Sequence, residues 1–493
     1  MRSTAFSQFL PVLRVLGVVL AFFSLGFFLP GGVSWAQDDG LGRSWLISGG
    51  VAFASGMLLW GGLRRFKREL HPRHGIVLVS LAWVLLPLFA SLPLMLTTQQ
   101  IGRPMSFTHA YFEAVSGLTT SGATVLTGLD KLPLSINMWR TFLQWLGGMG
   151  ILVLAVAILP LLGAGGCQQF KDEVGGPIKD NRLTPRITDT AKGLWGIYAA
   201  LSVACLAAYW AGGMSLADAV MHMFSTVSLG GLSSHDASFG YFDSPLLETV
   251  ALVFMLVASC NFALYFTALR KGHLRSVWRD LELRATLTAL LGGGLVVAAL
   301  LWFKGTYGPL EALRLGVFHA VSVGSTTGYA TVDYLAWPVF APMFMLLLSG
   351  IATSAGSTGC GIKMVRVLIL LKQAGREMSR LVHPRAVQPV KLGNMVVEDR
   401  VIFAVLAFML VYGGTIITLA MLLVLSDVDP VTAFSAVIAS VNCTGPGLGA
   451  VGPSAHYGVL GDFELWVCTL GMVLGRLELL SFIALLTPSF WRR

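Results

Sequence analysis

Apolar runs of membrane length recur along the whole chain, separated by short polar or basic stretches. The first two cover about Pro11–Pro30 and Ser44–Leu63. Each is long enough to cross a bilayer as a helix, which takes about 20 residues. The second run follows closely and no clean small-residue cleavage site fits the first, which argues against a secretory signal peptide. We therefore predict two N-terminal membrane helices.

A unit of four parts then recurs four times: a spanning helix, a segment too short to span, a return helix and a basic loop. The spanning helices are predicted at Ile76–Thr98, Ala191–Trp210, Ala285–Phe303 and Val401–Leu425, and the return helices at Ile136–Leu162, Pro245–Leu269, Pro338–Leu371 and Phe463–Leu486. Internal repeats of this kind are common in transport proteins. We predict an all-α polytopic membrane protein with ten spans, in which a two-helix extension (residues 1–70) precedes four pore repeats (71–190, 191–284, 285–398 and 399–493).

Composition agrees with a membrane protein. The chain is 55% apolar and only 12% charged, whereas soluble domains carry about 25% charged residues. The net charge of +9 would suit a nucleic-acid partner, but the basic residues lie in short loops between apolar runs, as the positive-inside rule expects. We therefore expect the lipid bilayer as a partner of this chain, and we do not expect it to bind nucleic acid. All basic clusters fall on one side, so both termini are predicted to be cytoplasmic.

The six cysteines are scattered and include no C-x-x-C pair, so we predict neither a disulfide framework nor a metal site among them. They are Cys167, Cys205, Cys260, Cys360, Cys443 and Cys468. Small apolar packing residues are the simplest interpretation.

The four short segments share one pattern, a half-length helix followed by a polar stretch that contains glycine. They cover Ser106–Val125, Ser215–Ser233, Pro309–Thr331 and Pro430–Leu448. Aligned on one glycine, the polar stretches form four loops: loop 1 is Thr119, Thr120, Ser121 and Gly122; loop 2 is Ser228, Leu229, Gly230 and Gly231; loop 3 is Ser325, Thr326, Thr327 and Gly328; loop 4 is Asn442, Cys443, Thr444 and Gly445. Ser215 with Asp218 resembles a capping box, and Asp429 before Pro430 suits a helix start.

Loops of this composition, dipped between membrane helices, favour a cation pathway. An extended backbone can turn its carbonyl oxygens inward to replace the water shell of an ion. Glycine permits the unusual backbone angles that this needs, and the C-terminal end of each half helix favours a cation. Any one of these glycines could simply pack against a neighbouring helix. Four in register, about a hundred residues apart, favour one pore with pseudo-fourfold symmetry.

Several further motifs, together with the loops, resemble the Trk/Ktr/HKT superfamily of potassium transporters, and within it the bacterial Trk systems. They are Q-W-L-G-G-M-G-I (Gln144–Ile151), A-I-L-P-L-L-G (Ala157–Gly163), A-G-S-T-G-C-G-I-K (Ala355–Lys363), L-V-H-P-R-A-V (Leu381–Val387) and G-R-L-E (Gly475–Glu478). The resemblance implies potassium uptake across the bacterial inner membrane, with K⁺ bound by loops 1 to 4. It also implies a homodimer, a cytoplasmic TrkA-type nucleotide-binding regulatory subunit, and no organic cofactor on this chain. Two residues depart from the family pattern, Ser121 in place of threonine and Cys443 in place of asparagine.

A dense cluster of small residues interrupts the third return helix between Gly350 and Gly361. Glycine costs about 1 kcal/mol in a helix interior, so the cluster predicts a broken helix. The resemblance identifies it as a gate, with Gly350, Ala355, Gly356, Ser357, Thr358, Gly359, Gly361 and Lys363 as its residues. A close-packed helix interface is the alternative. A phosphate-binding loop is excluded, because the G-x-x-x-x-G-K-[ST] pattern is missing.

Arg476 lies inside an apolar run of the last helix, where an ionisable residue is costly and is a functional candidate by default. The resemblance places it below the loops, facing the pore. Pairing with Glu478 or a place at the membrane boundary is the alternative. Lys363 and Arg366 are either gate anchors or ordinary interface charges. His222 and His319 are interpreted as packing residues of the half helices.

Two other functions remain to be weighed. A Na⁺-permeable transporter, or a K⁺ symporter coupled to Na⁺ or H⁺, would have the same fold. A membrane-embedded enzyme would need a catalytic set such as paired aspartates or H-E-x-x-H at membrane depth, and the sequence contains none.

Overall fold

A computed structural model describes residues 9–66, 72–157, 183–272, 274–385, 388–393, 395–477 and 479–491. Glu478, most of the A-I-L-P-L-L-G motif and part of the basic loop predicted after the first return helix lie outside these residues. The described chain is mostly helical. Its one sheet is a pair of two-residue antiparallel strands, β1 (Lys391–Leu392) and β2 (Met395–Val396), with Lys391 opposite Val396.

The N-terminal extension is a pair of antiparallel helices. The first consists of α1 (Leu10–Phe23), the 3₁₀ turn η2 (Ser24–Phe27) and α2 (Phe28–Gln37), and the second is α3 (Gly42–Gly62). Gly17 and Gly56 lie where they cross, and a Cβ on either glycine would lie 2.7 Å from the carbonyl oxygen of the other. Small residues allow two membrane helices to approach this closely.

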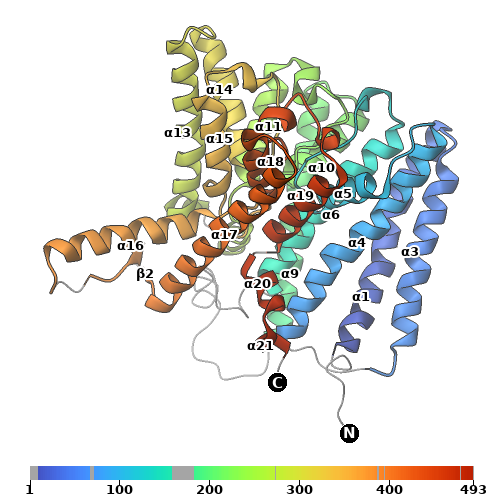
Figure 1. Cartoon of the computed structure of the whole chain (residues 1–493), viewed down its shortest axis with the longest axis horizontal. Helices are drawn as coiled ribbons and strands as arrows, with labels where there is room; N and C mark the ends of the chain where they lie inside the picture. The colour runs from blue at the N-terminus through green and yellow to red at the C-terminus, as the bar shows by residue number, and fades with distance from the viewer. Residues whose placement is uncertain are drawn as a thin grey trace.

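Four repeats follow, each with a spanning helix, a half helix and a return segment (Figure 1). The spanning helices are α4 (Pro72–Gln100), α9 (Leu183–Ala211), α13 (Leu281–Phe303) and α17 (Asp399–Leu425). The half helices are α5 (Phe107–Leu118), α10 (Leu216–Val227), α14 (Pro309–Gly324) and α18 (Pro430–Asn442). The return segments are α6 (Leu134–Ala157), α11 (Pro245–Ala258) with α12 (Phe262–Lys271), α15 (Phe340–Ile351) with α16 (Met364–Val382), and α19 (Asp462–Arg476) with α20 (Leu479–Leu486) and α21 (Pro488–Trp491). Short 3₁₀ turns lie between them: η3 (Leu129–Lys131), η4 (Ser238–Phe242), η5 (Leu274–Arg279), η6 (Tyr334–Ala336), η7 (Gly449–Val451) and η8 (Tyr457–Val459).

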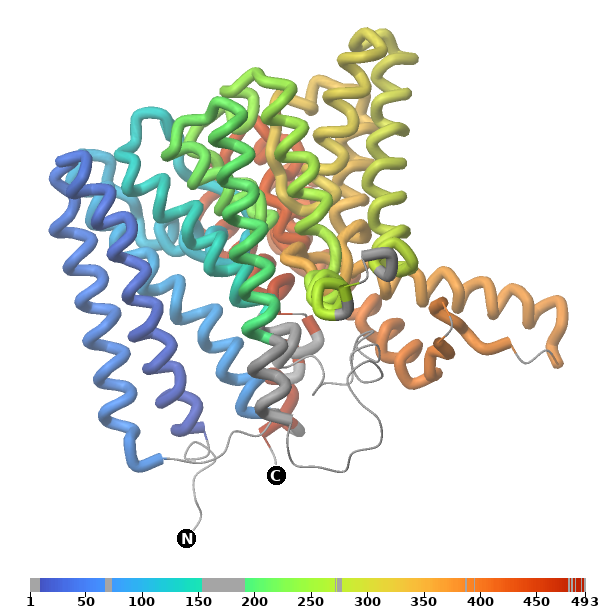
Figure 2. The backbone as a smooth tube through the Cα atoms, turned by 180° about the vertical axis from the view of Figure 1, so that it is seen from behind, coloured from blue at the N-terminus to red at the C-terminus, as the bar shows by residue number. Residues whose placement is uncertain are grey.

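The predicted fold class is confirmed, but the return helices of repeats 2, 3 and 4 are not the continuous rods that the sequence predicted. In repeat 2 the chain bends by 82° between α11 and α12. In repeat 3 α15 ends at Ile351, and α16 extends sideways away from the bundle (Figure 1 and Figure 2). In repeat 4 α19 ends at Arg476. Among the described helices, six are long and apolar enough to cross a membrane, or seven if the bent pair counts as one span.

The half helices form the centre of the molecule, and most of their side chains are buried. Two predicted helix starts are confirmed. The Asp218 N–H donates to the Ser215 hydroxyl at 3.1 Å, and the Thr432 N–H donates to the Asp429 carboxylate at 2.9 Å. The outer helices present large exposed apolar side chains such as Leu410 to the surroundings, as lipid-facing helices do.

The described ends of the chain meet at one end of the bundle. The rings of Phe9 and Trp491 lie 4.9 Å apart between centroids, and α1 begins at the same end at which α21 lies (Figure 1). An even number of crossings would bring the two ends to the same side, as the predicted topology requires.

Candidate ion pathway

Loops 1 to 4 leave their half helices through the same backbone turn. The second residue of each loop has a left-handed φ between 52° and 67°, and the N–H of the third residue donates to the carbonyl five residues earlier, over 2.8–2.9 Å. This hydrogen bond is characteristic of the Schellman motif at helix ends. The residues with left-handed φ are Thr120, Leu229, Thr326 and Cys443. All four half helices therefore end at equivalent points and direct their partial negative charge at the loops.

The glycines that end the loops show that the loops form a closed ring. A Cβ built on the glycine of loop 1 would lie 2.1 Å from a carbonyl oxygen of loop 2. The corresponding distance is 1.8 Å from loop 2 to loop 3, 2.1 Å from loop 3 to loop 4, and 2.9 Å from loop 4 to loop 1. The glycines are Gly122, Gly231, Gly328 and Gly445, and the oxygens belong to Gly230, Thr327, Thr444 and Ser121, in that order. Each loop thus abuts the next one in chain order, and the fourth abuts the first.

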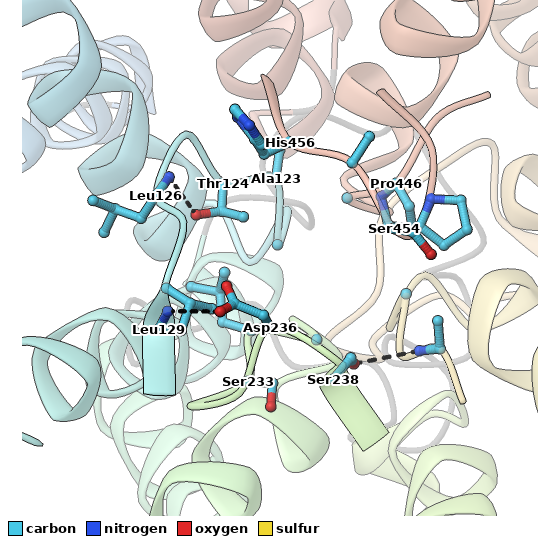
Figure 3. A pocket seen from close by; sticks show the side chains of 18 of the residues that line it. Ala123, Thr124, Leu126, Leu129, Ser233, Asp236, Ser238, Pro446, Ser454 and His456 are labelled. Carbon is cyan, nitrogen blue, oxygen red and sulfur yellow. Dashed lines mark hydrogen bonds between the residues drawn. The ribbon is translucent and has the colours of Figure 1, made fainter. Parts of the chain in front are cut away.

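The same four glycines line one cavity of about 340 Å³. Figure 3 shows its walls, in which segments of all four repeats follow one another around a common opening. Hydrogen bonds join segments of different repeats there, for example these two. The Leu129 N–H donates to Asp236 at 3.1 Å, and the Ala330 N–H donates to the Ser238 hydroxyl at 3.4 Å. The loops therefore meet at the floor of one vestibule.

The side chains behind the loops are not fourfold symmetric. In loops 1 and 3 the hydroxyls of the first and third residues bond to each other, at 2.9 Å and 2.8 Å. Loop 2 has glycine at its third position, and the Gln144 amide of α6 donates to that Gly230 carbonyl at 2.6 Å. In loop 4 the Asn442 amide donates to the Ser349 hydroxyl at 3.0 Å and accepts from the Tyr412 hydroxyl at 2.7 Å.

A buried ion pair holds the segment that follows loop 1. The Arg140 guanidinium of α6 contacts the Glu113 carboxylate of α5 at 2.6 Å, and both side chains are at most 1% exposed. Arg140 also donates to the Thr124 hydroxyl at 2.9 Å, and Glu113 accepts from the Val125 N–H at 3.0 Å. This pair was not among the residues predicted from the sequence, although charged residues inside two membrane-depth helices were a sufficient signal.

The small-residue stretch Gly350–Gly361, which we call the crossing segment, lies directly against the loops. The Thr358 hydroxyl donates to the Val227 carbonyl at the end of the second half helix, at 3.2 Å. A Cβ on Gly359 would lie 3.0 Å from the Thr326 hydroxyl of loop 3. The Cys360 sulfur accepts from the Arg476 guanidinium of repeat 4 at 3.3 Å. Three consecutive residues thus touch repeats 2, 3 and 4.

Arg476 connects the crossing segment to the remaining repeat. Its guanidinium donates to the Thr358 carbonyl at 2.8 Å and to the Gly147 carbonyl of α6 at 2.9 Å. It also contacts the Cys360 sulfur at 3.3 Å, and the side chain is 1% exposed. The crossing segment and Arg476 together therefore contact all four repeats.

The bend between α11 and α12, which the sequence analysis missed, is where the crossing segment docks. The Ser354 N–H donates to the Ser259 carbonyl at 3.0 Å, and the Phe262 N–H donates to the Gly356 carbonyl at 3.1 Å. From α13, the Glu282 carboxylate accepts from the Ala355 N–H at 2.6 Å. These hydrogen bonds take the place of the helical hydrogen bonds that are lost between α11 and α12 and between α15 and α16.

The other charged candidates have local roles in this arrangement. Lys363 has a left-handed φ of 77°, and its ammonium group donates to the Gly359 carbonyl, so it braces the crossing segment. The Arg366 guanidinium lies 4.2 Å above the Phe408 ring. His222 and His319 are fully buried, and each bonds to a carbonyl of its own half helix, at 2.9 Å and 2.8 Å. Both histidines thus pack in the half helices, as the sequence analysis interpreted them.

An ionic cluster joins repeats 1 and 2 at the vestibule. His235 contacts Asp130 through Nδ1 and lies 3.2 Å from Asp218 through Nε2. Burial alone lowers the pKa of His235, but its hydrogen bonds to the two aspartates outweigh burial and raise that pKa above its ordinary value of 6.5. Burial raises the pKa of each aspartate, and hydrogen bonding outweighs it, so both pKa values fall below 3.8. The two aspartates are therefore ionised near neutral pH, and they favour the protonated form of His235.

Comparison with known proteins places this architecture in a family. Residues 44–492 match the family described as TrkH, Cation transport protein. The chain belongs to this family. It is 43% identical over 488 residues to the Trk system potassium uptake protein TrkH of Vibrio parahaemolyticus, with 98% of this chain and 100% of that protein covered. It is 41% identical over 486 residues to TrkH of Escherichia coli, with 98% and 100% covered.

A solved structure agrees with the sequence relatives. The crystal structure of the potassium transporter TrkH from Vibrio parahaemolyticus superposes with a TM-score of 0.91 at 42% identity, covering 98% of this chain and 100% of that one. The family resemblance seen in the sequence is thereby confirmed. The chain is a multi-pass membrane protein of a transporter family, and the family is not one of enzymes.

Proposed function

We propose that this protein takes up K⁺ across the bacterial inner membrane through loops 1 to 4, which act as a selectivity filter. The ring closure carries the proposal. Each loop abuts a backbone carbonyl of the next, in chain order, around one axis. A ring of backbone carbonyls is the arrangement that replaces the hydration shell of a monovalent cation.

The partial charges around the loops would attract a cation without binding it so tightly that it could not leave. The four half-helix ends contribute partial negative charge, and none of the residues of loops 1 to 4 carries a charge. Two hydroxyls in the loops, those of Thr326 and Thr444, are buried without a protein partner among the described residues. A buried polar atom without a partner is costly, so we assign these hydroxyls to the surroundings of the ion.

The gate in this proposal is the crossing segment with Arg476. The segment contacts three repeats and Arg476 the fourth, so an ion that has passed the loops would meet them next. The guanidinium adds a positive charge on that route, which raises the barrier for a cation. Conduction therefore requires the segment to move, and we propose that a cytoplasmic TrkA-type regulatory subunit drives this movement in a homodimer with one pore per chain.

Ion flux in liposomes tests the proposal. Purified protein should carry Rb⁺, a K⁺ analogue, down its gradient, and K⁺ should compete better than Na⁺. Flux of Na⁺ at least equal to that of Rb⁺, or flux that requires a Na⁺ or H⁺ gradient, would establish the alternative transporter of the same fold. Protein that carries no monovalent cation, with or without the regulatory subunit, would refute the proposal. Rescue of a bacterium deficient in potassium uptake on low-K⁺ medium is the corresponding test in cells.

A further inference from the structure

Loop 2 differs from loops 1 and 3 in the way its backbone is held. In loops 1 and 3 the hydroxyl of the third residue, Ser121 or Thr327, bonds to the hydroxyl of the first residue of the same loop. Loop 2 has Gly230 at its third position, so it has no side chain that could make this bond. Gly231 follows, and glycine leaves a backbone more conformational freedom than any other residue. Loop 2 therefore needs support from another part of the chain.

This support comes from Gln144, a residue of α6. Its amide nitrogen donates to the Gly230 carbonyl at 2.6 Å, and its amide oxygen accepts from the Leu232 N–H at 3.2 Å. The first of these groups belongs to the peptide plane before Gly231, and the second belongs to the plane after it. One side chain thus fixes two successive peptide planes. A single orientation of the amide satisfies both bonds, because one partner is an acceptor and the other is a donor.

The carbonyl that Gln144 holds lies at the junction of loops 1 and 2. It is the oxygen that a Cβ on Gly122 would approach to 2.1 Å, and the Gln144 amide nitrogen lies 3.7 Å from the same Cβ position. Gln144 is fully buried, so bulk water does not compete for its bonds. Without the amide, the peptide plane between two glycines is free to rotate. Rotation would turn this carbonyl away from its present direction and take one oxygen out of the ring that replaces the water shell of the ion.

We propose that Gln144 is a positioning residue that determines the ion selectivity of the pathway. Its amide does for loop 2 what the hydroxyl pairs do for loops 1 and 3. The inference rests on the proposed function, in which the loops bind the ion. It predicts that the amide can be exchanged for a hydroxyl pair within loop 2 itself.

The geometry around Gly230 allows this exchange. A Cβ on Gly230 would lie 2.4–2.6 Å from its three nearest atoms, all of which belong to the Gln144 amide. The amide and a side chain at this position therefore exclude each other. Gly230 does not have the positive φ that disfavours a side chain. The Ser228 hydroxyl donates to the carbonyl four residues earlier at 2.7 Å, as the Thr119 hydroxyl does in loop 1, so its oxygen is placed to accept from a hydroxyl at the third position.

The ratio of Rb⁺ flux to Na⁺ flux into liposomes tests the role of the amide. Gln144→Met keeps a side chain of similar length but removes both hydrogen bonds. It should lower the ratio by about tenfold, the change to which the net contribution of one to two hydrogen bonds corresponds. Thr141→Val is the matched control, because Thr141 is equally buried in α6 and its hydroxyl donates to the Asn137 carbonyl of the same helix. The control should keep the wild-type ratio, and a wild-type ratio in Gln144→Met would overturn the proposal.

The exchange separates positioning from packing. Gln144→Ala and Gly230→Ser should each lower the ratio, whereas the two substitutions together should restore most of it, since residues in contact are not additive. Gln144→Ala with Gly230→Ala fills the space without a hydroxyl and should not restore the ratio. Equal ratios in these two double variants would overturn the proposal.

The two double variants differ by one oxygen atom, so they decide the question even if Gln144→Met does not fold. Each variant is checked by size exclusion before the assay. Absence of Rb⁺ flux from the wild-type protein would instead refute the proposed function, and this inference with it.

Discussion

The ring of loops predicts a graded response to a single added methyl group. In loop 2, the Cβ of Gly231→Ala would lie 1.8 Å from the Thr327 carbonyl oxygen, whereas ordinary van der Waals contact begins near 3.4 Å. The Cβ is fixed to the backbone of loop 2 and the oxygen belongs to the backbone of loop 3, so no side chain can rotate away. The two loops must therefore move apart by about 1.5 Å, which exceeds the roughly 0.5 Å tolerance of a preorganised site. The φ of 73° adds a further cost of about 1–2 kcal/mol for a residue with a side chain.

A displacement of this size should reduce Rb⁺ flux by about 100-fold or more, the loss expected from misplacing reacting groups by 1 Å. Gly445→Ala is the internal comparison, because its Cβ would meet the Ser121 oxygen at 2.9 Å. Relief of that contact needs only about 0.5 Å, so its loss of flux should be nearer tenfold. The larger loss of flux is expected for the variant whose Cβ would lie closer to the carbonyl oxygen of the next loop.

Gly305→Ala is the matched control for backbone strain. Gly305 has a φ of 69°, and nothing lies within 4 Å of its added Cβ. It carries the conformational cost of Gly231→Ala without the collision. Each variant is purified, checked for a single species by size exclusion and assayed by Rb⁺ uptake into liposomes. If Gly231→Ala conducts as well as Gly305→Ala, or if Gly445→Ala is the more damaging of the two loop variants, the ring does not set the ion site.

Three further predictions address the charged groups. Arg476→Ala should raise Rb⁺ flux without the regulatory subunit at least about tenfold, because it removes charge-assisted hydrogen bonds that hold the crossing segment, each contributing about 1.5–3 kcal/mol; unchanged flux in the same liposome assay would contradict a gating role. Glu113→Gln leaves the buried Arg140 charge without its partner and should destabilise the protein by about 3–5 kcal/mol, measured by thermal unfolding in detergent, where a shift no larger than that of a surface substitution would contradict the account. The raised pKa of His235 means that its stabilisation is fully present below pH 6.5 and declines as the pH rises through the raised pKa. The melting temperature of the wild type should therefore fall over that range relative to His235→Gln, and parallel curves would show that the cluster contributes nothing.

Much of the architecture was predictable because it depends on local pattern. Apolar runs of membrane length mark the spanning helices whatever their neighbours are, and the basic loops set their direction. The caps at Ser215 and Asp429 are likewise local, since each depends on residues within one helical turn. The breaks are different. Ser259–Asn261 looks like part of a continuous apolar helix, and only the crossing segment docked against it supplies the partners that make a bend tolerable at membrane depth.

The sequence by itself determined the class of protein, the fourfold repeat and the residues of the loops, because length, hydropathy and glycine spacing are properties of one chain read in order. Only the tertiary structure decided how the loops meet, since ring closure depends on contacts between residues that lie far apart in the sequence, such as Gly445 and Ser121. It also brought Glu113 to Arg140 and Arg476 to the crossing segment. Each of these pairs is buried, and a buried polar group must find its partner across the fold rather than along the chain.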